Sequence, residues 1–295
     1  FVFTQKQILI NLFFSKHFTK SLLLSAFIPT LFANILNAQS IDPCGSHKVM
    51  KELVEKKPEM KSYFDAQQKN LIAAIKHAKA NRKSANDEYI IPVVVHVFHT
   101  GQTIGATDPN LNNSVPNPSS AQVQAAVDLA NSDFNKRANK NRYVGGDSVG
   151  IKLCLAKKDP NGNSLPGGAI TRHNGSLQST WTSTGKAATY AAEYPTDGVK
   201  RSGTAGVDHA DLTVVEQWDI NKYYNIYLVT EIDNSDAGAG VKGFAYYPNT
   251  VSDYAVMDPT SFSATNVTTF VHEMGHALNL AHTFVGSNGD PGDYT

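Results

Sequence analysis

The run Tyr89–Phe98 constrains the fold more than any other part of the 295-residue chain. It is almost continuously apolar and rich in β-branched residues, which predicts a strand buried on both faces. The hydrophobic content of 41% is ordinary for a globular protein and excludes wholesale disorder, collagen and coiled coil. Two cysteines cannot hold together a chain of this length, so a small disulfide scaffold is excluded as well.

Segments downstream of this run alternate between strand and helix patterns. Strands are predicted at residues 149–156, 225–230, 243–247 and 254–257. Ser119 or Ser120 can cap a helix whose apolar stripe has helical spacing: Val123, Ala126, Val127, Ala130 and Phe134. Residues 173–211, rich in Ser, Thr, Ala and Gly, carry no strong pattern and are interpreted as a loop or insertion. The alternation predicts a mixed α/β layer architecture.

Residues 1–39 have the pattern of a secretory signal peptide. The first twenty residues carry three lysines and no acid, and an apolar run and a few small residues follow. The apolar run is short and is broken by Pro29, so a membrane anchor helix is the weaker alternative. Export would make the protein secreted and extracellular, in an oxidising compartment.

Residues 40–87 are predicted to be a prosegment with two helices, His47–Lys57 and about Met60 to Ala85. Residues 48–88 carry ten Lys and Arg against six Asp and Glu, whereas residues 89–295 carry thirteen against nineteen. The segment has little core of its own and must dock or stay mobile. We expect it to lie on the acidic remainder of the chain. A solvated charged helix without a partner is the alternative.

Three histidines fall in one window, His272-Glu-Met-Gly-His276-Ala-Leu-Asn279-Leu-Ala-His282. Apolar residues at helical spacing predict a helix that puts His272 and His276 on one face, where both can bind one zinc ion. Glu273 lies beside them, placed to hold a metal-bound water. His282 returns to the metal if the helix ends near Asn279, since asparagine tolerates positive φ. Three imidazoles leave one zinc position open, which is typical of a catalytic site.

The window resembles the metzincin pattern His-Glu-x-x-His-x-x-Gly-x-x-His, with Asn279 in place of the usual glycine. Within this clan the chain is similar to the bacterial pappalysins, secreted metalloproteases. Further stretches carry the resemblance over about residues 89–295: Tyr89–Phe98, Leu153–Asn163, Ile170–Arg172, Asn225–Val229, Gly243–Pro248 and His282–Phe284. It implies an α/β fold over residues 88–295, a metzincin-type catalytic domain with a mixed twisted sheet, a backing helix and a zinc-binding active-site helix.

The resemblance also implies a zinc-dependent endopeptidase that is made as a latent zymogen. His272, His276 and His282 would bind zinc, and Glu273 would act as general base on the metal-bound water that attacks the peptide carbonyl. The alternative is a secreted binding module that keeps the zinc site without turnover.

Two further predictions concern substrate and latency. A rim strand of Gly243, Phe244 and Ala245 would pair antiparallel with an extended peptide or protein substrate, unless it is a plain edge strand. Cys44 of the prosegment would bind the open zinc position and silence the zymogen. A Cys44–Cys154 disulfide and a buried, inert Cys154 are the alternatives.

The region after the zinc motif carries the remaining predictions. Asp290 and Asp293 would bind calcium, as the corresponding loop does in relatives, or would form a plain polar turn. The methionine-containing turn and the tyrosine of the family would lie beyond Thr295, so we expect a sequence truncated before them. The net charge of zero indicates no nucleic-acid partner, and no membrane partner is expected once the signal peptide is removed. Cleavage specificity and oligomeric state are not predicted.

Overall fold

The computed structural model describes residues 44–80, 88–135, 149–177, 193–195, 197–201, 206–233, 240–249 and 252–282. The chain divides into Phe1–Ser40 and Ile41–Thr295, and the described residues all belong to the second unit. The predicted signal peptide therefore lies outside them. Among the residues that are described, no helix has the length and apolar character needed to cross a membrane.

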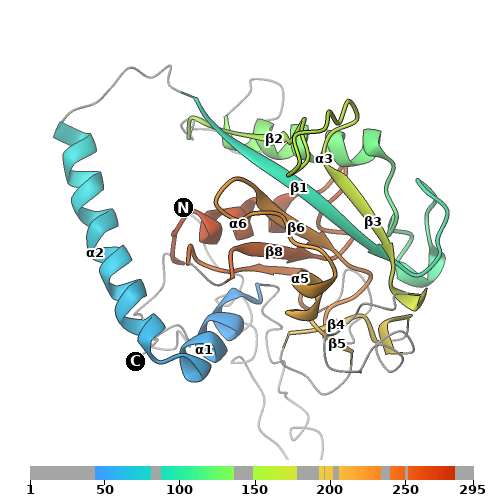
Figure 1. Cartoon of the computed structure of the whole chain (residues 1–295), viewed down its shortest axis with the longest axis horizontal. Coiled ribbons are helices and arrows are strands. Elements are labelled where there is room, and N and C mark those ends of the chain that lie inside the picture. The colour runs from blue at the N-terminus through green and yellow to red at the C-terminus, as the bar shows by residue number, and fades with distance from the viewer. Residues whose placement is uncertain are drawn as a thin grey trace, which may run out of the picture. The chain divides into compact units, whose positions relative to one another are not determined.

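The helices and strands follow one another in a mixed order (Figure 1). The α-helices are α1 (Ser46–Lys56), α2 (Glu59–Ala80), α3 (Ser120–Phe134), α5 (Asp211–Val215) and α6 (Thr268–Ala277). The 3-10 helices are η1 (Pro109–Leu111) and η2 (Gly175–Leu177). The strands are β1 (Tyr89–His99), β2 (Ile151–Leu155), β3 (Ile170–Asn174), β4 (Val199–Lys200), β5 (Val207–Asp208), β6 (Tyr224–Leu228), β7 (Gly243–Ala245) and β8 (Tyr254–Met257).

A six-stranded sheet in the order β2-β1-β6-β8-β7 lies at the centre, with β3 also paired to β1. The long strand β1 pairs in parallel with β2 through its first half, with β3 through its second half, and with β6. Strand β8 continues the parallel order beside β6, and β7 runs antiparallel to β8 at the edge. The predicted mixed α/β fold is confirmed.

Strand β1 is buried on both faces from Val93 to Phe98, as its sequence predicts, whereas Tyr89 and Ile90 at its start are exposed, so the buried part is shorter than predicted. Its valines at alternate positions, Val93, Val95 and Val97, belong to the core cluster that also contains residues of α3 and α6. Phe98 belongs to a second cluster, which includes residues of α1. Successive side chains of a strand point to opposite faces, so the apolar run supplies both cores at once.

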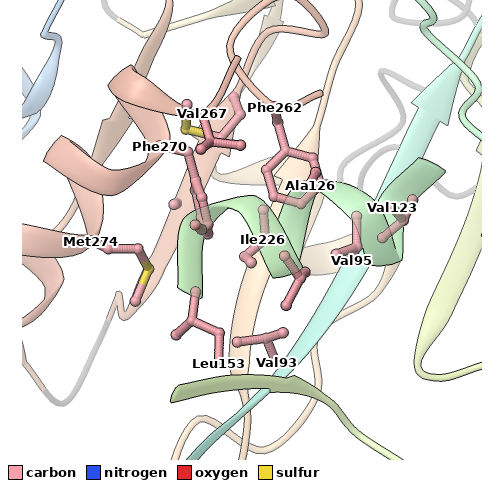
Figure 2. Packing of buried hydrophobic residues seen from close by; sticks show 14 of the residues in the cluster. Val93, Val95, Val123, Ala126, Leu153, Ile226, Phe262, Val267, Phe270 and Met274 are labelled. Atoms are coloured by element: carbon pink, nitrogen blue, oxygen red, sulfur yellow. The ribbon is translucent and has the colours of Figure 1, made fainter. Parts of the chain in front are cut away.

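Helices α3 and α6 pack on one face of the sheet (Figure 2). Helix α3 begins with a capping box, in which the Ser119 hydroxyl accepts from the backbone N–H of Gln122 and the Gln122 amide oxygen accepts from that of Ser119. Phe270 and Met274 of α6 are buried in the cluster, and full burial of one such side chain stabilises by roughly 1.5–3 kcal/mol. This packing fixes the helix that carries the histidines.

The N-terminal segment, residues 44–80, docks through apolar contacts. Val49, Met50 and Leu53 of α1 are buried in one cluster with Phe244 of β7 and Tyr254 of β8. The two ion pairs Lys56–Glu52 and Lys61–Asp65 each join residues of a single helix. Apolar packing thus holds the described part of α1, and the expectation of a basic arm on an acidic surface stays a prediction.

Two parts of the sheet region differ from the predictions. Residues 173–211 are not all loop, because β3 ends at Asn174 and β4 pairs in parallel with β5. All five residues of β3 are only half-buried and several are polar, so the strand lacks the apolar pattern that identifies β1. The strand predicted at 243–247 ends earlier, at Ala245.

Candidate metal centre

Helix α6 ends where the asparagine predicts it. Asn279 has φ of 68° and donates its backbone N–H to the carbonyl of His276 at 2.8 Å, and Leu280 donates to that of Gly275 at 2.9 Å. These two bonds form a Schellman motif, which satisfies carbonyls at the helix end. The turn reverses the chain, so His282 comes back to the face of α6 that carries the other two histidines.

The three histidine side chains meet at their Nε2 atoms. The Nε2–Nε2 distances are 3.2 Å for His272 and His276, 3.0 Å for His272 and His282, and 3.1 Å for His276 and His282. A tetrahedral zinc ion about 2.0–2.1 Å from each nitrogen needs ligand separations of about 3.3–3.4 Å. The donor set and its spacing therefore fit zinc, with movements of a few tenths of an ångström.

The tautomer of His276 suits a metal ligand. Its Nδ1 lies 2.8 Å from the carbonyl oxygen of Leu280, which can only accept, so Nδ1 carries the proton and Nε2 presents its lone pair. The ring also meets the ring of Tyr247 edge to face, at 5.3 Å between centroids. His276 is buried whereas His272 is exposed, so the centre opens to solvent on one side.

Cys44 completes the group of possible ligands. Its Sγ lies 3.4 Å from Nε2 of His276 and 3.8 Å from Oε2 of Glu273. One donor atom from each of Cys44, His272, His276 and His282 lies within 4.8 Å of the others. Cys44 and Cys154 both lie in the part of the chain that the structure describes, and they form no disulfide there. The alternative of a Cys44–Cys154 disulfide is therefore wrong.

Glu273 is fully buried beside the histidines. Its Oε2 accepts a hydrogen bond from the hydroxyl of Ser46 at 2.6 Å. The same hydroxyl oxygen accepts from the backbone N–H of Ala245 at 2.9 Å. Sequence reasoning did not find Ser46, because a serine at the start of a helix gives no signal for a partner 227 residues away.

Strand β7 forms the edge of the sheet beside this centre. The N-terminal segment lies on that edge, where Cys44 forms a parallel bridge with Gly243. The Gly45 N–H donates to the Gly243 carbonyl at 2.9 Å. Phe244 points away from the edge into the cluster shared with α1, and Ala245 lies in the other cluster. In this structure the backbone edge of the predicted rim strand is therefore occupied by the N-terminal segment, and pairing with a substrate stays a prediction.

The part of the chain that carries the metal centre matches a known family. The family model Peptidase_M43, described as Pregnancy-associated plasma protein-A, matches residues 208–294, which contain the three histidines and Glu273. This segment belongs to the pappalysin family. The resemblance to pappalysin-like metzincins is confirmed for it, and with it the class of zinc metallopeptidase. The family implies zinc, and the group of Cys44 and the histidines could hold it.

Solved structures of mirolysin and promirolysin are also similar to the chain. A promirolysin variant of Tannerella forsythia has 21% identity and a TM-score of 0.48, over 81% of this chain and 69% of that one. Mature mirolysin of the same organism, in complex with a cleaved peptide, has 21% identity and a TM-score of 0.44, over 70% and 68%. Mirolysin in complex with compound 9 has 24% identity and a TM-score of 0.44, over 69% and 67%. No curated protein sequence gives a significant match.

A second group of ligand types lies away from the zinc motif of the pappalysin segment. Donor atoms of His96, His173 and Glu216 lie within 4.8 Å of one another. Each already has a protein partner, since His96 bonds Thr171 at 2.8 Å and Asn225 at 2.9 Å, and His173 meets Glu216 at 2.9 Å. Burial lowers the pKa of His96 to about 4, and the bond from His173 lowers that of Glu216 to about 2. The group is a satisfied hydrogen-bond network that joins β1, β3 and β6.

The predicted calcium ligands Asp290 and Asp293 lie outside the described residues, which end at His282. Calcium binding in this part of the pappalysin segment stays a prediction.

Proposed function

We propose that the chain is a secreted zinc endopeptidase made as a latent zymogen. Residues 1–39 would direct export, residues 40–87 would keep the enzyme silent, and residues 88–295 would hydrolyse peptide bonds. One observation carries the proposal: three imidazole Nε2 atoms meet 3.0–3.2 Å apart beside the buried carboxylate of Glu273.

His272, His276 and His282 would hold the zinc ion. When bound, zinc supplies Lewis acidity, which lowers the pKa of a water to about 7 and polarises a carbonyl oxygen. The chain contributes the orientation of the ligands. The Leu280 carbonyl fixes the ring of His276, and the Schellman turn at Asn279 brings in His282.

Glu273 would move the proton. Glu273 follows His272 directly, and its carboxylate is fully buried. We propose that it accepts a proton from the attacking water and later delivers that proton to the leaving amine. One group would thus serve first as base and then as acid. Departure of the N-terminal segment would free Oε2 from Ser46 for this role.

Strand β7 would bind the substrate. It is an edge strand, and its Gly243 carbonyl and Ala245 N–H already bind the Gly45 N–H and the Ser46 hydroxyl of the N-terminal segment. A peptide substrate would use the same two groups in the opposite direction, antiparallel to β7. Side chains beyond Gly243, Phe244 and Ala245 would set the cleavage preference.

Cys44 would enforce latency. A thiolate is a good zinc ligand, and Sγ lies 3.4 Å from Nε2 of His276, on the side where the histidines leave a ligand position open. Binding there would exclude the water that hydrolysis needs.

The test uses the full chain before and after removal of the N-terminal segment. Zinc content is measured together with hydrolysis of fluorogenic peptides, with and without chelator. Glu273→Ala is expected to lower activity about 10²–10⁴-fold and to retain zinc, because the base is lost and the ligands remain. Asp128→Ala, at an exposed carboxylate of α3, is the matched control and should change neither quantity. Full zinc occupancy without cleavage of any peptide would instead establish the non-catalytic alternative.

A further inference from the structure

Ser46 lies between the carboxylate of Glu273 and the edge strand β7, the two parts of the site that a substrate would need. Its side chain is fully buried, as is that of Glu273. Its oxygen lies 2.6 Å from Glu273 Oε2 and 2.9 Å from the backbone nitrogen of Ala245. One hydroxyl therefore contacts both the carboxylate and the edge of β7.

The direction of the two bonds follows from counting protons. A serine hydroxyl has a single proton and two lone pairs. The Ala245 N–H can only donate, so it takes a lone pair of the oxygen, and the single hydroxyl proton goes to Glu273. The carboxylate thus already accepts a hydrogen bond from Ser46, as it would from the attacking water.

The backbone beside Ser46 leaves this contact little freedom. A Cβ at Gly45 would lie 2.9 Å from Cβ of Phe244 and 2.9 Å from Nη1 of Arg201, so the chain runs pressed against β7. The Gly45 N–H is bound to Gly243, and α1 begins at Ser46 and is anchored by its buried apolar side chains. The Ser46 hydroxyl is therefore held in place by the Gly45–Gly243 bond before it and by the buried side chains of α1 after it.

We propose that Ser46 is a second latency residue, which blocks the general base and the substrate-binding edge while Cys44 blocks the metal. The proposal rests on the proposed function for the role of Glu273. The thiol of Cys44 is a weak donor and lies 3.8 Å from the same Oε2, so it does not replace the hydroxyl. Ser46 is a positioning residue that acts through Glu273, and it leaves the site with the N-terminal segment.

The first experiment measures how often the segment opens, without using activity. Cys154→Ala in the full chain leaves Cys44 as the single thiol, and Cys44 is buried. The rate at which a thiol reagent labels Cys44 in chelator-treated protein reports opening. Ser46→Ala is expected to raise this rate about ten- to a hundredfold, since it removes a hydrogen bond to a charged, buried group. Ser62→Ala, at an exposed serine of α2, is the control and should leave the rate unchanged.

A double-mutant cycle separates the proposed role from simple packing. In a Glu273→Ala background, the effect of Ser46→Ala should shrink by at least about threefold, because the charged partner is gone and the Ala245 contact alone remains. An equal effect in both backgrounds would overturn the proposal. So would an unchanged labelling rate for Ser46→Ala.

Activity distinguishes failure of this proposal from failure of the proposed function. Before processing, Ser46→Ala zymogen should show several-fold higher peptide cleavage than the parent; equal cleavage would count against a latency role. After the segment is removed, both proteins should have the same activity, because residue 46 is no longer in the site. If neither processed protein cleaves peptides, the proposed function fails, while the labelling cycle still decides whether Ser46 holds Glu273.

Discussion

Met50→Ala should release the N-terminal segment without touching the metal centre. The side chain is 1% exposed and belongs to the cluster that includes Phe244 of β7 and Tyr254 of β8. Truncating a buried methionine to alanine costs about 2–5 kcal/mol. If this cost acts on docking of the segment, the equilibrium constant for opening rises between about 30-fold and a few thousandfold, since each 1.36 kcal/mol is a factor of ten.

The assay compares the variant with its parent as full-length zymogens. While the open fraction is small, basal peptide cleavage rises in proportion to the opening constant, so an increase of at least about 30-fold is expected. Lys51→Ala, at an exposed position of the same helix, controls for general weakening of α1. Activity after removal of the segment must be equal in all three proteins. Unchanged basal cleavage by Met50→Ala would refute the view that apolar packing holds the segment down.

Two further predictions concern the turn after α6 and the buried histidine of β1. Asn279→Ala should weaken zinc binding in a metal titration, because alanine at a φ of 68° costs roughly 1–2 kcal/mol and the turn places His282, whereas Asn279→Gly should retain the affinity. His96 is buried with a pKa of about 4, against 6.5 unfolded. The unfolded state therefore binds the proton first, and stability is full above about pH 6.5 and falls by at most about 3 kcal/mol as pH drops to 4. Urea unfolding of the parent and of His96→Gln should reveal this: the parent loses stability over that range, and equal slopes for both proteins would contradict the assignment.

Local sequence patterns predicted those helices, strands and turns that are marked by residues close together in the sequence. The apolar run of β1 identifies a strand buried on both faces, and the serine before α3 identifies its capping box. The same holds at the metal centre, where Asn279 marks the end of α6 and the return of His282. In each case the signal lies in residues a few positions apart, so it can be read directly from the sequence.

Contacts between distant segments could not be predicted in this way. Strand β3 is half-buried and partly polar, and its place beside β1 is visible only when the sheet is assembled. Ser46 meets Ala245 and Glu273 across 199 and 227 residues. Net charge suggested that the segment would dock by electrostatics, but apart from Ser46 the side chains that are described as buried in α1 are apolar. Composition averages over a segment, whereas docking depends on the face that is buried.

The way the N-terminal segment is held also explains how a single cut could activate the enzyme. Cys44 lies just before α1 and Ser46 is its first residue, so the buried apolar side chains of α1 help to hold both residues against β7. While the segment is joined to β1 through residues 81–88, docking is intramolecular and benefits from a high effective concentration. Cleavage in that connection would change none of these contacts. It would make their reformation bimolecular, so the metal position and the proposed general base would be released together when the segment dissociates on dilution.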